Sequence, residues 1–164
     1  MTIEISPITE HDINGYHQLL DIVARERQYI SFLKAPPLEH TKAFILHSIS
    51  QNYPQFVAKI DQQIIGWCDT LPKNQEIYSH SAILGMGILP EFRKNGVGTA
   101  LIEATLKKAF EQKIIRIELA VFSDNQPAIQ LYKNFGFIIE GELKNDVRID
   151  DQFKNSLVMA IVRK

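Results

Sequence analysis

The stretch Gly85-Met86-Gly87-Ile88-Leu89-Pro90-Glu91-Phe92-Arg93-Lys94-Asn95-Gly96-Val97-Gly98-Thr99-Ala100 is the most informative part of this chain. The apolar run over residues 81–89 predicts a strand, and the periodicity over residues 98–112 predicts a helix. Glycines within a strand mark a bulge or a place where another group approaches the backbone closely. The quoted stretch therefore predicts a glycine-bearing strand that turns directly into a helix.

The turn itself has the chemistry of an anion site. The first amides of a helix have no intrahelical partner, and the helix dipole favours negative charge there. Gly96 and Gly98 let ligand oxygens approach the backbone, while Arg93 and Lys94 add positive charge. The pattern indicates a phosphate-binding turn, and an ordinary glycine turn before a helix is the alternative.

Two familiar phosphate motifs fit this turn poorly. In a dinucleotide fingerprint Glu118 would lie at the right distance to bind a ribose, but Leu101 occupies the position of the third glycine. A Walker loop is excluded, because Gly-Lys-Ser and Gly-Lys-Thr do not occur in the chain.

Outward from this centre, strand and helix patterns alternate without a linker or a repeat. Strands are predicted over residues 2–7, 55–60, 63–70, 114–122, 137–142 and 155–162. Helices are predicted after Thr9, after the Pro36-Pro37 loop (an amphipathic helix carrying Leu38, Phe44, Ile45, Leu46 and Ile49), and from Asp124 or Asn125 to a stop at Gly136. We expect one α+β domain spanning residues 1–164.

Composition excludes several classes of protein. The 164 residues carry 18 Lys and Arg against 19 Asp and Glu, so bulk charge does not predict a nucleic-acid partner. The single cysteine, Cys68, predicts neither a disulfide nor a structural metal site. No signal-peptide or membrane-spanning pattern is present, so the sequence predicts a soluble, cytoplasmic protein without a metal or a membrane partner.

The sequence resembles the GNAT superfamily of acetyl-CoA-dependent N-acetyltransferases. The family's signature, Arg or Gln, two residues, Gly, one residue, then Gly or Ala, matches Arg93 to Gly98 without a gap. Residues 124–129 and 131–137 resemble the family's second cofactor-binding block. The resemblance implies a central, mixed, mostly antiparallel sheet of about six to seven strands with about four helices and a splayed central strand pair.

The resemblance also implies acetyl-CoA as cosubstrate. Its diphosphate would lie on the turn before the helix, and its pantetheine arm would pair with a bulged strand, whose Ile88 amide would polarise the thioester. The residues implied to bind it are Met86, Gly87, Ile88, Arg93, Lys94, Asn95, Gly96, Val97, Gly98, Thr99, Asn125 and Tyr132.

By the same resemblance Tyr132 is the general acid, a phenol that is protonated at neutral pH; without the motif it would be a core aromatic. Asp69 and His80 are candidates for the general base, and a water relay would need neither. Cys68 is expected to be a buried apolar residue, and Trp67 to face the opposite side of its strand. The Pro36-Pro37 loop and residues 146–153 would border the acceptor site.

The implied reaction is direct acetyl transfer to a primary amine of a small molecule, an amino acid or a peptide N-terminus. Two other hypotheses remain open: a non-catalytic acyl-CoA-binding domain and a nucleotide-dependent oxidoreductase. Family members are often dimers, so a homodimer is one expected state.

Overall fold

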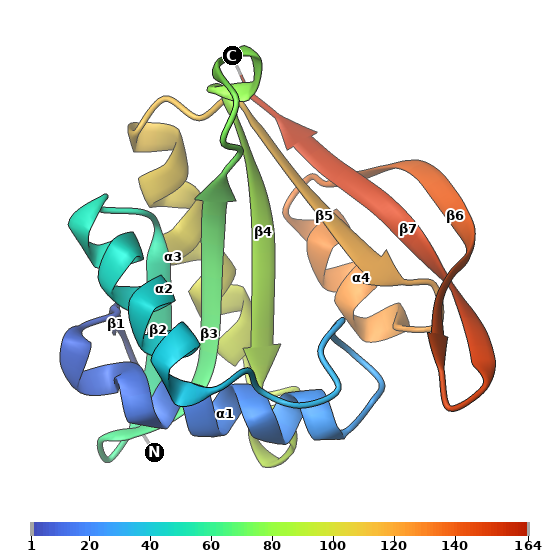
Figure 1. Ribbon diagram of the computed structural model, residues 1–164. Helices are drawn as coiled ribbons and strands as arrows, with labels where there is room; N and C mark the ends of the chain where they lie inside the picture. Colours follow the sequence, from blue (N-terminus) through green and yellow to red (C-terminus); the bar gives the residue numbers. More distant parts are fainter. Residues whose placement is uncertain (1, 164) are drawn as a thin grey trace.

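The computed structural model describes residues 2–163, which form a seven-stranded sheet of order β1-β2-β3-β4-β5-β7-β6 (Figure 1). The strands are β1 (Glu4–Pro7), β2 (Gln55–Ile60), β3 (Gln63–Pro72), β4 (Ser81–Ile88), β5 (Arg116–Phe122), β6 (Ile138–Ile149) and β7 (Gln152–Val162). The helices are α1 (Ile13–Arg25), α2 (Leu38–Ser50), α3 (Val97–Glu111) and α4 (Gln126–Asn134). Within residues 2–163 only β4 and β5 pair in parallel, so the predicted α+β fold with a mixed, mostly antiparallel sheet is confirmed.

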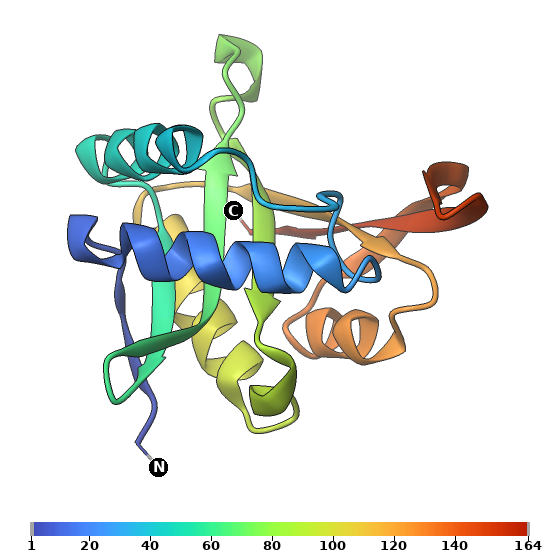
Figure 2. The same ribbon diagram turned by 60° about the horizontal axis from the view of Figure 1, so that its bottom comes forward.

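The helices form a layer on each face of the sheet. Helices α1 and α2 cover one face, and α3 and α4 cover the other (Figure 2). Strand β3 is consequently buried on both faces: Trp67 packs against Tyr16 of α1 with ring centroids 5.6 Å apart, while Cys68 lies against Thr105 of α3. The prediction that these neighbours face opposite sides is confirmed.

Local turn chemistry sets several element boundaries. Asp61 and Gln62 have φ angles of 48° and 69°, as a two-residue hairpin turn between β2 and β3 requires. The Thr9 amide donates to the Asp12 carboxylate at 2.8 Å in the short turn that leads into α1. Gly136 ends α4 with a φ of 99°, as its position after the helix predicts.

Two predictions about the elements were wrong. Helix α2 buries Thr41, Ile45 and Ser48, whereas its apolar residues Leu38, Leu46 and Ile49 are exposed. The last two strands are longer than predicted, because residues 143–149 and 152–154 also belong to them, on either side of a turn at Asp150 and Asp151. Leu143, Val147 and Ile149 alternate with charged residues in this hairpin, but almost the whole of β6 is exposed, so the alternation does not mark a buried face.

Strands β4 and β5 separate after a short parallel contact. They pair only where Ser81, Ala82 and Ile83 face Arg116, Ile117 and Glu118. Figure 1 shows the two strands diverging from this end toward their carboxyl ends. The predicted splayed central pair is confirmed, and the divergence opens the centre of the sheet.

Candidate functional site

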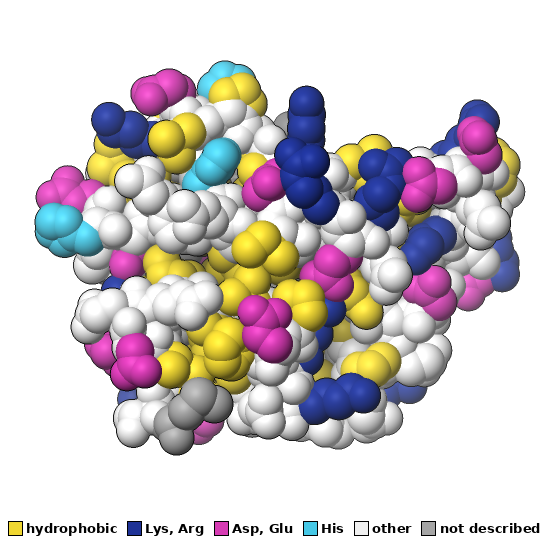
Figure 3. Space-filling model, turned by 90° about the horizontal axis from the view of Figure 1, so that it is seen from below, with side chains coloured by type: hydrophobic (Ala, Val, Ile, Leu, Met, Phe, Trp, Pro, Cys, Tyr) yellow, Lys and Arg dark blue, Asp and Glu magenta, His cyan; other side chains and the backbone are white. Residues whose placement is uncertain are grey.

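A cavity of about 1030 Å³ lies where β4 and β5 diverge. It is bordered by β3, β4 and β5, by α1, α2 and α4, and by the loop before α3. In Figure 3, which views the molecule from this end, hydrophobic side chains gather in the middle of the face and charged side chains surround them. The cavity is therefore the main feature of the open end of the sheet.

The edge of β4 presents backbone groups to this cavity. The Leu89 amide donates to the Ile65 carbonyl at 2.8 Å, and the β3–β4 register continues without a shift from there to Ala82. Hydrogen-bonded pairs alternate along an antiparallel ladder, so the amides of Met86 and Ile88 point away from β3 and toward the divergence. The continuous register also shows that the expected bulge in β4 was wrong on the side facing β3.

The two glycines of β4 make room for side chains of β3. A Cβ on Gly87 would lie 2.3 Å from the Trp67 ring, and a Cβ on Gly85 would lie 3.3 Å from an Asp69 carboxylate oxygen. Glycine at these positions lets both side chains fold across β4 and line the cavity. The sequence predicted a close approach here, and the neighbours that approach are Trp67 and Asp69.

The loop before α3 has the geometry of an anion site. Lys94 and Gly96 have φ angles of 63° and 81°, which wind the chain into the helix. The first hydrogen bond of the helix is the one that the Ala100 amide donates to the Gly96 carbonyl at 3.1 Å. The amides that precede Ala100 in the first turn therefore have no partner within the helix. Gly98 also lets α3 lie close to α4, because a Cβ at this position would lie only 3.0 Å from the Leu131 side chain.

The predicted binding residues divide into two groups. Those that line the cavity are Met86, Gly87, Ile88, Arg93, Lys94, Gly96, Gly98, Thr99, Asn125 and Tyr132. Asn95 and Val97 do not line it; Val97 is buried in the hydrophobic core.

The Arg93 side chain is held within the protein. Its two terminal nitrogens donate to the Glu26 carboxylate at 2.8 and 2.6 Å, and its Nε donates to the Ile88 carbonyl at 3.0 Å. The guanidinium also lies over the Tyr29 ring, 4.5 Å from its centroid. Arg93 thus ties the segment after α1 to the loop before α3. Sequence reasoning missed Glu26, because no local spacing links it to a residue so distant in the chain.

Helix α4 places Asn125 and Tyr132 at the cavity. The Asn125 side-chain oxygen accepts from the Ala128 amide at 3.3 Å, which confirms Asn125 as the N-cap. Tyr132 is 7% exposed and packs against Phe137, with ring centroids 5.8 Å apart. Burial, with a smaller contribution from Cys68, raises the pKa of Tyr132, so its phenol is a hydrogen-bond donor at neutral pH.

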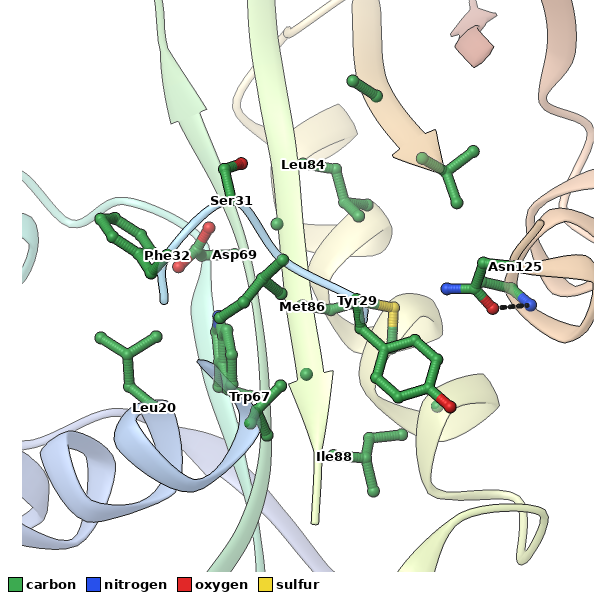
Figure 4. Close-up of a pocket in the computed structure, with 18 of the residues that line it drawn as sticks. Leu20, Tyr29, Ser31, Phe32, Trp67, Asp69, Leu84, Met86, Ile88 and Asn125 are labelled. Atoms are coloured by element: carbon green, nitrogen blue, oxygen red, sulfur yellow. Dashed lines mark hydrogen bonds between the residues drawn. The ribbon is translucent and has the colours of Figure 1, made fainter. Parts of the chain in front are cut away.

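Asp69 is the buried carboxyl group of the cavity. Gln55 Nε2 donates to it at 3.2 Å, and the Gly85 amide also lies against it. Burial outweighs these two contacts and raises the pKa of Asp69 to about 7. Figure 4 shows the carboxylate beside Trp67 and Phe32, near the middle of β4.

The other candidate base, His80, is exposed and precedes β4, at the end opposite the cavity. It lies outside the cavity lining, so of the two candidate bases only Asp69 borders the cavity. Pro36 borders the cavity, as do Asp146 and Val147 of β6, so both segments expected at the acceptor site reach it.

Residues 2–163 contain neither a group of metal ligands nor a membrane-spanning helix. No three His, Cys, Asp or Glu side chains in this part of the chain gather as metal ligands would. None of its helices has the length and apolarity needed to cross a membrane.

Comparison with known proteins identifies the family. An L-amino acid N-acetyltransferase (AaaT) of Escherichia coli strain K12 is 29% identical over 158 residues, which cover 95% of this chain and 97% of the relative. A spermidine N(1)-acetyltransferase of the same strain is 24% identical over 161 residues, covering 98% of this chain and 86% of the relative. The structure of a GNAT superfamily phosphinothricin acetyltransferase from Sinorhizobium meliloti in complex with acetyl-CoA has a TM-score of 0.92 at 16% identity, covering 99% of this chain and 89% of that one. The model of the acetyltransferase (GNAT) family matches residues 17–137, so the chain belongs to this family and is an acyltransferase.

Proposed function

We propose that residues 1–164 form a single N-acetyltransferase domain that moves the acetyl group of acetyl-CoA directly to a primary amine of a small molecule, an amino acid or a peptide N-terminus. The observation that most supports this is the divergence of β4 from β5, with the free β4 edge at the centre and the start of α3 at its end. We also propose a cytoplasmic location, because the only cysteine, Cys68, is a buried free thiol.

The cavity suits the donor in shape and charge. The first amides of α3 and the Lys94 ammonium would hold the diphosphate. The outward amides of Met86 and Ile88 would hold the extended pantetheine arm and the thioester oxygen. Asn125, at the start of α4, would contact the same arm across the divergence. When bound, acetyl-CoA supplies the activated acyl group.

Asp69 prepares the acceptor. An alkylamine is an ammonium ion at neutral pH and must lose a proton before its nitrogen attacks the carbonyl carbon. A carboxylate with a pKa of about 7 binds that ammonium and takes up its proton more readily than an ordinary aspartate. Because Asp69 faces the α1 and α2 side of the sheet, the amine enters from that side.

Tyr132 acts on the departing sulfur. Its buried phenol remains protonated at neutral pH and lines the cavity from α4. The pKa of this phenol lies above that of a thiol, so its main effect is to stabilise the departing thiolate by a hydrogen bond. Cys68 takes no covalent part, because burial raises the pKa of its thiol well above the usual range.

Release of free thiol from acetyl-CoA tests the proposal over a panel of primary amines, with coenzyme A and NADH as thermal-shift ligands. We expect amine-dependent release and stabilisation by coenzyme A. Stabilisation without turnover on any amine would favour a non-catalytic acyl-CoA-binding domain. Stabilisation by NADH alone would reject the acetyltransferase reaction.

A further inference from the structure

Resting on the proposed function, we propose that the acceptor is a primary amine with one positive charge and an apolar body the size of an aryl or short alkyl group. Asp69 would bind its ammonium. The cavity on the α1 and α2 side of the sheet would enclose the rest.

The cavity on the α1 and α2 side of Asp69 is mostly apolar, and its polar side chains include Tyr16, Ser31, His40 and Thr41. The apolar side chains that line this part of the cavity include Leu20, Val23, Phe32, Phe44, Trp67 and Leu71. Figure 4 shows Leu20 and Phe32 on the same side of the cavity as Trp67 and Asp69. Binding to such a wall is favoured when it covers apolar substrate surface and disfavoured when it covers a charged group.

The cavity has too few carboxylates near Asp69 to bind a polyamine. Among the described residues that line the cavity, the acidic side chains are Asp69 and Asp146. Asp146 is exposed and belongs to β6, which lies across the divergence from β3 in the strand order. A second ammonium near Asp69 would therefore be buried against apolar groups without a partner.

The basic groups disfavour an α-amino acid. The described lining contains Arg93, Lys94 and His40. Arg93 is bound to Glu26, Lys94 belongs to the loop before α3, and His40 is exposed on α2. An α-carboxylate would thus be held within a few ångströms of Asp69, and like charges at that distance repel.

Matched amines test the inference. Thiol release would be measured with 2-phenylethylamine, phenylalanine, phenylalaninamide and spermidine. We expect kcat/KM for 2-phenylethylamine to exceed that for phenylalanine and for spermidine by about tenfold or more. Phenylalaninamide has the bulk of phenylalanine without its carboxylate, so its kcat/KM should be close to that of 2-phenylethylamine.

Phe32→Ser tests the apolar wall, because Phe32 is 52% exposed and its loss should leave the fold intact. We expect the preference for 2-phenylethylamine over ethylamine to fall about tenfold. Leu33→Ser is the matched control, since Leu33 is similarly exposed in the same segment and does not line the cavity.

The results separate the two proposals. Turnover of no amine would reject the proposed function and the inference together. A preference for spermidine or phenylalanine, or an unchanged preference in Phe32→Ser, would reject the inference and leave the acetyltransferase reaction standing.

Discussion

Asp69 lies in the core of the sheet, where a carboxyl group is costly, and at the cavity, where it is useful. Its pKa of about 7 means that the folded protein holds a proton that the unfolded chain has already lost near pH 4. The free energy of unfolding should therefore fall as pH rises from about 4 to 7. A carboxyl group that lowers stability in this way fits the proposed role of Asp69 as the base for the acceptor amine.

Asp69→Asn should remove that penalty. We expect the variant to exceed the wild type in free energy of unfolding by about 4 kcal/mol at pH 8, with little difference at pH 4, since one pKa unit corresponds to about 1.4 kcal/mol. Urea unfolding at both pH values measures this. Asp146→Asn, which alters an exposed carboxylate of the same cavity, is the control and should leave the pH dependence of the wild type in place. Parallel pH curves for Asp69→Asn and the wild type would show that Asp69 ionises as an ordinary aspartate.

The same ionisation should appear in the kinetics. We expect kcat/KM for the amine to rise through about pH 7 as Asp69 loses its proton, and Asp69→Asn to lose this step. Of the other titratable groups on this side, burial keeps the pKa of Tyr16 well above neutrality, and His40→Gln separates a contribution of the imidazole. Retention of the step in Asp69→Asn would assign it to another group.

Tyr132→Phe should change the chemistry and preserve binding. Loss of the phenolic hydroxyl removes the hydrogen bond to the departing sulfur, so we expect kcat to fall about 100-fold while KM for acetyl-CoA changes less than about threefold. Steady-state kinetics measure both, and Cys68→Ala, which should keep kcat, shows that packing alone is not responsible. A raised KM at unchanged kcat would make Tyr132 part of the binding wall only.

At the scale of the elements, the strand-turn-helix unit was predictable because its signals are local. Residues 81–89, the turn and α3 follow from apolar periodicity, glycine spacing and helix capping. The roles of Gly85 and Gly87 were not predictable in detail, because the side chains that need their space belong to β3 and are brought there by the sheet register. The predicted strands of the β6–β7 hairpin stopped short at residues 142 and 155, because the residues beyond them are held by pairing with each other rather than by burial of one face.

The Glu26–Arg93 pair connects two such elements, and Glu26→Gln tests its role. Both side chains are about one quarter exposed, and the pair is bidentate, so we expect a stability loss of about 1 kcal/mol. Because Arg93 also holds the Ile88 carbonyl, we expect KM for acetyl-CoA to rise about fivefold with kcat nearly unchanged.

Arg27→Gln is the control for this pair. It removes the more exposed ion pair between Arg27 and Asp150. It should change neither the free energy of unfolding nor the KM for acetyl-CoA measurably. Tighter binding of acetyl-CoA by Glu26→Gln would instead mean that Glu26 restrains Arg93 from a phosphate.

At the scale of the whole molecule, the sheet consists of two parts joined over one short parallel contact. Strands β1 to β4 form one part, and β5 to β7 the other. The sequence predicted this division only through family resemblance, since no local pattern shows where two strands stop pairing. A ligand lying along the free edge of β4 and reaching α4 would contact both parts, so its binding should stabilise the entire fold.

Coenzyme A at 100 times its dissociation constant should add about 2.7 kcal/mol to the free energy of unfolding and raise Tm by about 5–10 °C. Hydrogen exchange should slow at the amides of Met86 and Ile88 and in the first turn of α3. Pantetheine, which lacks the diphosphate, should protect the β4 edge alone, and adenosine diphosphate the turn alone. Protection confined to other elements would place the ligand outside the divergence, because the edge amides of β4 exchange slowly only when a partner accepts their hydrogen bonds.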